Sequence, residues 1–187
     1  MMKLTRVCCL LLICCAAQGC AEFKQGFIEG QQEQAISQID DLIDKGVESV
    51  KLGDAKFAEA VDKLDTDLAG ARALADEASE AYRRAGEHMS KAAFLADYSG
   101  GLAPAGWVKD YHRAKAAQYR NFVERMKLRR TQVAAFAVSK SSEEAKGRLW
   151  PLTREMDKLT VEGQQLQEKV SRIEAEHNVA PAATGGK

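Results

Sequence analysis

All five cysteines of the 187-residue chain lie in its first twenty residues, within the segment VCCLLLICCAAQGC from Val7 to Cys20. Cysteine thiols pair into disulfides, bind metal ions or accept covalent groups. Four of the five stand among leucine, isoleucine and alanine, where they serve as small apolar residues. Cys20 is therefore the thiol whose chemistry matters most.

The segment around these cysteines has the three parts of an export signal. Lys3 and Arg6 precede an apolar run of about eleven residues, and small residues follow the run. The run is shorter than the roughly twenty apolar residues that span a bilayer. We therefore expect residues 1–19 to be a signal peptide that is cut before Cys20. The mature chain would then contain neither a disulfide nor a cysteine metal site.

The end of this segment, Ala17-Gln18-Gly19-Cys20, resembles the end of a bacterial lipoprotein signal peptide, because it closes on Gly-Cys. Ala17 departs from the leucine that is usual in that class. The resemblance implies that Cys20 carries a diacylglycerol, which would anchor the protein to a membrane of the bacterial cell envelope. An ordinary signal peptidase would cut the same bond and leave a free thiol on Cys20.

The remaining residues form no recognisable catalytic or metal-binding pattern. His88, His112 and His177 are widely spaced, and the pair Glu174 and His177 has no second copy of the kind that di-iron helical bundles use. No serine stands in a nucleophile-elbow context, and no glycine-rich loop follows a strand pattern. We expect no metal, no cofactor and no enzymatic activity.

The segment from Trp107 to Arg130 is strongly basic, with eight lysines and arginines interleaved with aromatic residues. This composition suits nucleic acid, a phosphate or a lipid headgroup. Export argues against nucleic acid, as does the mature net charge near −2, from 25 basic and 27 acidic residues. We expect a charged helix face that pairs with the acidic first half of the chain.

The rest of the chain has the heptad pattern of long helices. Every seventh residue from Ile36 to Ala92 is apolar, and the set four positions later is apolar at seven of nine places. This exceeds the three or four heptads that indicate a coiled coil. We expect an all-α fold over residues 36–178, a long antiparallel helical hairpin, preceded by an anchor and linker at residues 20–35.

The clearest boundary is an expected turn at residues 98–105, around Gly100 and Gly101, and a further break is expected between 139 and 151. The arms on either side of the turn match in length and carry net charges of −8 and +6, so they should attract each other. A bend at Gly46 or Gly53 would fold the first arm into a three-helix bundle. Otherwise the hairpin would associate with copies of itself or with partners. Residues 179–187 have the composition of a disordered tail.

Tyr98, Leu102 and Trp107 lie in or beside this turn, at the end of the hairpin farthest from Cys20. Exposed side chains there would anchor a partner, or the two aromatics would cap the seam by packing on each other. We expect a non-enzymatic spacer, scaffold or adaptor, tethered through lipid on Cys20, that engages an envelope protein. The alternative is an exported, unlipidated helical binding protein or surface-coat component.

Overall fold

The computed structural model describes the backbone of residues 4–179 and the side chains of residues 30 and 34–179. This part of the chain forms four helices, which are α1 (Leu4–Lys63), α2 (Leu68–Leu102), α3 (Trp107–Ala137) and α4 (Ser142–Glu176). No strand interrupts them within residues 4–179. The expectation of an all-α fold is confirmed.

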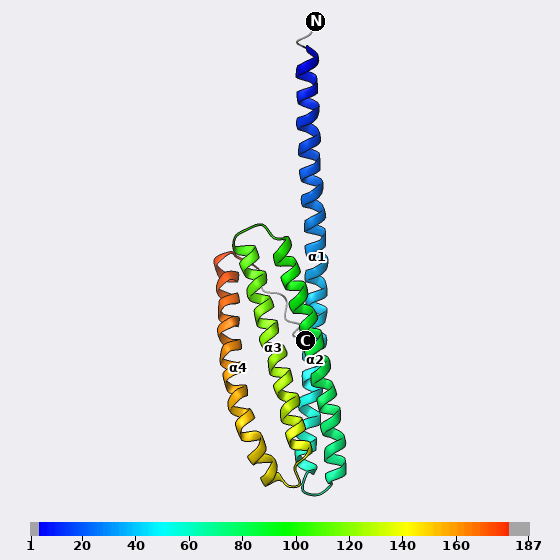
Figure 1. The fold of residues 1–187 in the computed structure, drawn as a ribbon, viewed down its shortest axis with the longest axis vertical. Coiled ribbons are helices and arrows are strands. Elements are labelled where there is room, and N and C mark those ends of the chain that lie inside the picture. The colour runs from blue at the N-terminus through cyan, green and yellow to red at the C-terminus, as the bar shows by residue number, and fades with distance from the viewer. Residues whose placement is uncertain (1–3, 180–187) are drawn as a thin grey trace.

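The four helices pack in chain order, each antiparallel to the one before it (Figure 1). α1 and α2 pack on each other, α3 packs on α2, and α4 covers the outer side of α3. A core of buried side chains joins α1, α2 and α3, and Ala145 of α4 extends it. The first arm therefore folds back on itself into a bundle, which is the thicker of the two arrangements that the sequence allows.

The first reversal lies at residues 64–67, between α1 and α2, and not at Gly46 or Gly53. Asp67 begins α2, because its side chain accepts a hydrogen bond of 2.9 Å from the backbone N–H of Gly70. Leu64 before the turn is buried and Leu68 after it is half-buried, and their spacing of four is also the spacing within a helix. The apolar pattern thus continues across a break in the helix.

Gly46 and Gly53 are buried contact points of α1 rather than bends. A methyl group on Gly53 would lie 2.7 Å from Cε1 of Tyr82, and one on Gly46 would lie 2.8 Å from Cε of Met89. Tyr82 and Met89 belong to α2, so each glycine makes room for a large side chain of the neighbouring helix. The helices approach closely here because the glycines have no side chain.

The alanine half of the heptad pattern is the central seam of α2. Each of its members is fully buried, namely Ala71, Ala78, Ala85 and Ala92. In α1 the buried residues, such as Ala35, Ile39 and Ala60, fall outside the predicted seam. Ile36, which begins that seam, is 45 % exposed. Small residues at the seam of α2 let both neighbouring helices come close to it.

The second connection begins later than the glycines suggest. α2 continues through Gly100 and Gly101 to Leu102, and the chain turns at residues 103–106. Gly100 is buried where α2 crosses α3, and a methyl group on it would lie 3.2 Å from Cβ of His112. Gly106 precedes α3 with φ of 126°, a conformation that requires glycine.

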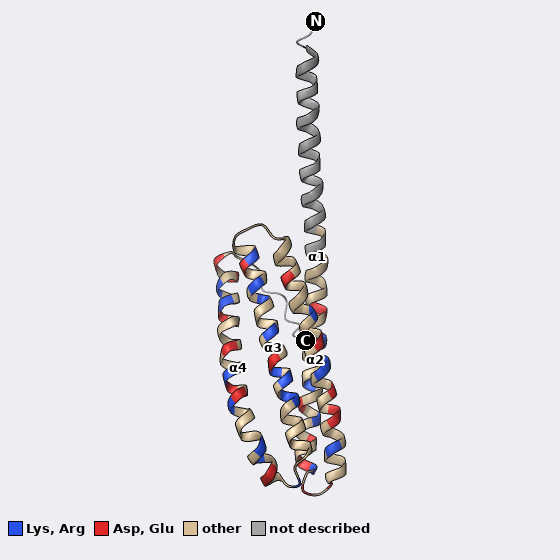
Figure 2. Cartoon of the chain, viewed as in Figure 1, with Lys and Arg blue, Asp and Glu red and all other residues tan. Residues whose placement is uncertain are grey.

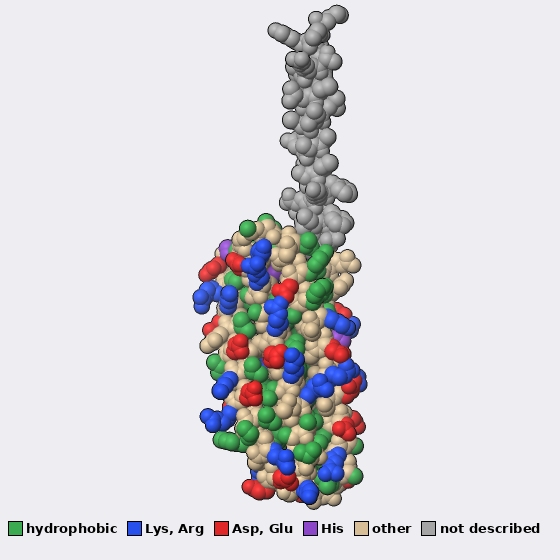
Figure 3. All heavy atoms as spheres, viewed as in Figure 1, with side chains coloured by type: hydrophobic (Ala, Val, Ile, Leu, Met, Phe, Trp, Pro, Cys, Tyr) green, Lys and Arg blue, Asp and Glu red, His purple; other side chains and the backbone are tan. Residues whose placement is uncertain are grey.

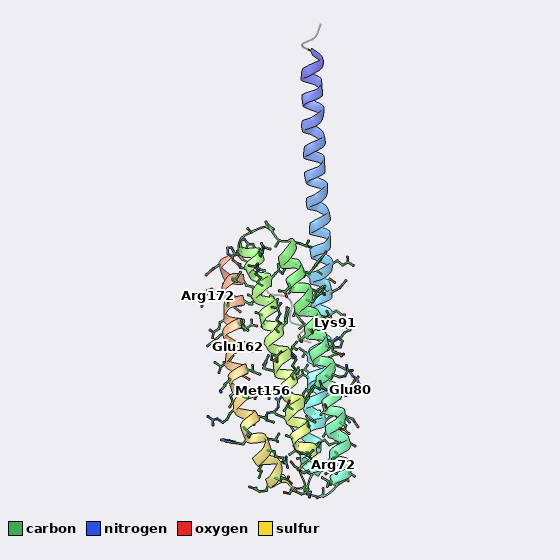
Figure 4. The ribbon with its side chains drawn as sticks, in the orientation of Figure 1. Arg72, Glu80, Lys91, Met156, Glu162 and Arg172 are labelled. Carbon is green, nitrogen blue, oxygen red and sulfur yellow. The ribbon has the colours of Figure 1, made fainter. Side chains whose placement is uncertain are left out.

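The third connection lies at residues 138–141, beside the first. Ser141 caps α4 by accepting a hydrogen bond of 3.3 Å from the backbone N–H of Glu144, and Pro151 is accommodated within the helix. Asp65 of the first connection accepts hydrogen bonds from the backbone N–H and hydroxyl of Ser142, which lower the pKa of its carboxyl. Nearby, Nε of Arg72 (labelled in Figure 4) donates to the carbonyl of Ala137 at 3.0 Å. These bonds tie two connections together at one end of the bundle.

The contact between α3 and α4 is largely polar. Tyr111 donates a 3.1 Å hydrogen bond to Glu174, and Asn121 donates one of 3.0 Å to the carbonyl of Leu159. Between these two lies a hydrogen bond from Gln118 to Gln167. In α4 only Ala145 and Val170 are fully buried, while the rest of its apolar stripe, including Leu152, Met156, Leu159 and Leu166, is half-buried. Hydrogen bonds therefore contribute much of what positions α4.

We predict that Gly53→Ala destabilises the protein. The added methyl group meets the buried ring of Tyr82, which costs about 1–3 kcal/mol of overpacking and outweighs the gain of about 1 kcal/mol in helix propensity. Gly147→Ala is the matched control, because that glycine is exposed in α4 and has no neighbour within 4 Å. Thermal unfolding followed by circular dichroism should show a lower Tm for the first variant and an equal or higher Tm for the second. A rise in Tm for both would contradict the close contact.

Candidate functional site

The three residues predicted to bind a partner lie at the end of the bundle where the connection between α2 and α3 is found. Tyr98 and Leu102 belong to the last turns of α2, and Trp107 is the first residue of α3. Because the chain reverses at residues 64–67, α1 enters the bundle at this same end (Figure 1). The expectation that these residues lie far from the N-terminal segment is therefore wrong.

The capping alternative pairs Trp107 with Tyr98, and the structure gives Trp107 another ring partner. The ring of Trp107 stacks instead on His177, which follows α4, with centroids 4.4 Å apart and planes 10° apart. The side chain of Trp107 remains 41 % exposed. This contact fastens the end of α4 to the beginning of α3.

Tyr98 and Leu102 form one line with Phe94, and we call these three residues the α2 stripe. The spacing of four places them along one face of α2. Phe94 is 69 % exposed, the largest exposed fraction among the large hydrophobic side chains that the structure describes, and Tyr98 is 43 % exposed. Hydrophobic side chains gather near this end of α2 in Figure 3.

Shallow hollows flank Phe94 on both sides. One opens toward α1 and is lined by Leu42 and Leu95, and the other opens toward α3 and is lined by Val123. Lys91 lines the first hollow, and Figure 4 shows it on the outer side of α2. The stripe thus combines apolar side chains that project from the surface with grooves that can receive apolar side chains of a partner.

Phe94 is not among the predicted site residues, although the sequence contains a signal for it. Phe94, Tyr98 and Leu102 recur with a spacing of four and stand apart from the buried line of Met89, Ala92 and Ala96. Reading Gly100 and Gly101 as a turn removed Tyr98 and Leu102 from the helix, so the shared face was not visible. The continuation of α2 to Leu102 restores it.

The basic segment from Trp107 to Arg130 becomes most of α3, and many of its charges have acidic neighbours. Arg120 pairs with Asp97 of α2, and Arg129 lies 3.9 Å from Asp54 of α1. Other pairs form within the second half of the chain, between Lys115 and Glu174 at 3.3 Å and between Lys127 and Glu124 at 2.7 Å. Figure 2 shows the two signs interspersed along α3 and α4. This pattern favours a charged helix face over an anion-binding site.

Glu174 and His177 have separate environments. Glu174 accepts from Tyr111 and pairs with Lys115, whereas His177 stacks on Trp107. The described residues contain no group of three or more histidine, cysteine, aspartate or glutamate side chains arranged to hold a metal ion. Among the same residues, no helix is both long and apolar enough to cross a membrane.

The predicted lipidation site and the whole predicted signal peptide lie outside the region of described side chains, as does most of the predicted tail. Cys20 falls within α1, but nothing of its side chain is described, and residues 180–187 are likewise not described. Comparison with known proteins finds no match to any family model, curated protein or solved structure.

We predict that Trp107→Ala loosens the end of α4. The stack on His177 contributes about 0.5–1.5 kcal/mol, and its loss should speed amide exchange at residues 173–179 about two- to tenfold. Trp150→Ala is the control, because Trp150 is 68 % exposed and lies in α4 near the end of that helix opposite His177. Hydrogen exchange measured by mass spectrometry should separate the two variants. Equal exchange in both would show that the stack does not hold this end.

Proposed function

We propose that this protein is exported, is anchored in the bacterial cell envelope through lipid on Cys20, and acts as a non-enzymatic helical adaptor. Support for export comes from Lys3 and Arg6, the apolar run after them and the Gly19-Cys20 step. Two attached acyl chains give stable membrane attachment, so the chain needs no membrane-spanning helix to stay anchored. The anchor and the bundle are joined through α1.

The α2 stripe is the observation that supports an adaptor role. Large apolar side chains exposed together mark interaction sites, since burying one contributes about 1.5–3 kcal/mol. Phe94 and Tyr98 stand out from the bundle, and aromatic side chains are among the strongest contributors at protein interfaces. The partner we propose is another envelope protein with an apolar helix or ridge.

Charged residues at the border of the stripe suit such an interface. Lys91 and Asp97 are exposed on α2 beside Phe94, and Asp97 pairs with Arg120 of α3. An apolar centre with a charged, solvated rim is the usual anatomy of a protein–protein interface. The stripe lies where α1 enters the bundle, so the partner would lie on the side of the bundle nearer the anchor.

We predict that Cys20→Ser releases the protein from the membrane. The hydroxyl cannot receive the thioether-linked lipid, so fatty-acid labelling should disappear and the protein should move to the soluble fraction. Cys14→Ser is the matched control, because Cys14 lies in the apolar run that cleavage removes. Intact mass of the mature protein is the direct measurement. An unmodified thiol on Cys20 would instead identify the exported, unlipidated binding or surface-coat protein.

We also predict that a photo-crosslinking amino acid at Phe94 captures one discrete partner in living cells. The same substitution at Val161 is the control, because Val161 is 52 % exposed on α4, which lies on the far side of α3 from α2. Adding Leu102→Asp, which places a charge on the α2 stripe, should abolish capture at Phe94. A product of twice the chain mass would make the partner a second copy, and equal capture at both positions would overturn the adaptor proposal.

A further inference from the structure

A cavity of about 220 Å³ lies beside the end of the bundle where α1 enters. Residues of α1, α2 and α3 line it, together with Val179, which follows α4. The lining residues are Ile36, Ile39, Asp40, Ala96, Tyr111, His112, Lys115, Tyr119 and Val179. The α2 stripe does not contribute to the cavity, which is therefore a separate candidate site.

The size and walls of the cavity suit a small organic molecule. Ile36, Ile39 and Ala96 provide apolar surface from α1 and α2. An apolar cavity of about 150 Å³ holds a benzene molecule, so this one has room for a single ring or a short carbon chain with one polar group. A drug-sized ligand would need at least about 300 Å³.

Two polar groups of the lining lack partners among the described residues. Tyr119 is only 8 % exposed, yet its hydroxyl makes no hydrogen bond to that part of the protein. Asp40 is an exposed residue of the lining, and its carboxylate forms no ion pair or hydrogen bond with the described residues. The hydroxyl itself is accessible from the cavity, so it can hydrogen-bond to a molecule held there.

The other titratable groups of the lining are already satisfied or uncharged. Lys115 lies 3.3 Å from Glu174 and 5.5 Å from the centre of the Tyr111 ring, and Tyr111 donates to the same carboxylate. Burial lowers the pKa of His112, so it is neutral at pH 7. Because Glu174 offsets the charge of Lys115, the Asp40 carboxylate gives the cavity a net charge of −1.

This negative charge also affects the pKa of Tyr119. Burial raises the pKa of Tyr119, and the nearby carboxylates of Asp40 and Glu174 raise it further. Asp40 and Tyr119 line the same cavity, so the carboxylate charge acts near the hydroxyl and the electrostatic potential there favours positive charge. An anionic ligand would meet two carboxylates and a lysine that is already paired.

We propose that the cavity binds a small organic amine, whose ammonium group donates hydrogen bonds to the Asp40 carboxylate and the Tyr119 hydroxyl. The hydrocarbon part of the amine would pack on Ile36, Ile39 and Ala96. A metal ion fits less well, because the described residues offer no cluster of three ligands. This assignment does not depend on the lipid anchor or on the α2 stripe.

Benzylamine is a suitable probe, with benzyl alcohol and benzoate as neutral and anionic analogues of similar size. Isothermal titration of the purified mature protein should show saturable binding of benzylamine with Kd below about 1 mM. Both analogues should bind at least tenfold more weakly, because hydrogen bonds to a charged group are the stronger kind. Absence of benzylamine binding, or equal binding of benzyl alcohol, would overturn the proposal.

Variants locate the binding. Asp40→Asn keeps the shape of the side chain and removes its charge, so benzylamine affinity should fall about tenfold or more. Asp44→Asn makes the same change one turn further along α1, outside the cavity lining, and should leave the affinity unchanged. Tyr119→Phe should lower the affinity severalfold, with an unchanged circular dichroism spectrum. An equal effect of the two aspartate variants would indicate a general surface charge effect and refute the site.

Discussion

The close contact between α1 and α2 is the constraint on which the rest of the bundle depends. Gly53 admits the ring of Tyr82 against the backbone of α1, and the Tyr82 hydroxyl then donates a 2.6 Å hydrogen bond to Asp54. Asp54 also faces Arg129 of α3 at 3.9 Å. One glycine thus aligns a tyrosine, a carboxylate and an arginine from three helices. A larger residue at this position would separate the first two helices and disturb the third.

Much of the fold could be predicted from the sequence because heptad spacing reports directly on burial. The alanine series of α2 is buried as expected. The position of the first reversal could not be read in the same way. Leu64 and Leu68 keep helical spacing across the reversal. A glycine can mark either a bend or a close helix contact, and the sequence pattern is the same in both cases. Gly46 and Gly53 mark contacts because α2 happens to place large side chains opposite them.

The candidate sites were less accessible to sequence reasoning, for a geometric reason. Tyr98, Leu102 and Trp107 could be selected because they stand near glycines and a proline, yet their surroundings depend on which helices meet at that end. The cavity brings together Asp40 and Tyr119, which are far apart in sequence and are joined only by the packing of α1 beside α3. No local pattern contains that information. The two residues come together once the turn at residues 64–67 fixes the direction of α2.

The polar contact between α3 and α4 determines where α4 sits along its axis. A half-buried stripe of leucines is almost unchanged when a helix slides by seven residues, about 10 Å. Hydrogen bonds from Tyr111 to Glu174 and from Gln118 to Gln167 permit no such shift, since each donor would face a different side chain. These hydrogen bonds fix the register of α4 along α3, which the repetitive apolar surface alone does not fix. The last described residue, Val179, is thereby held beside the entry of α1, a position that apolar packing of α4 alone would leave undefined.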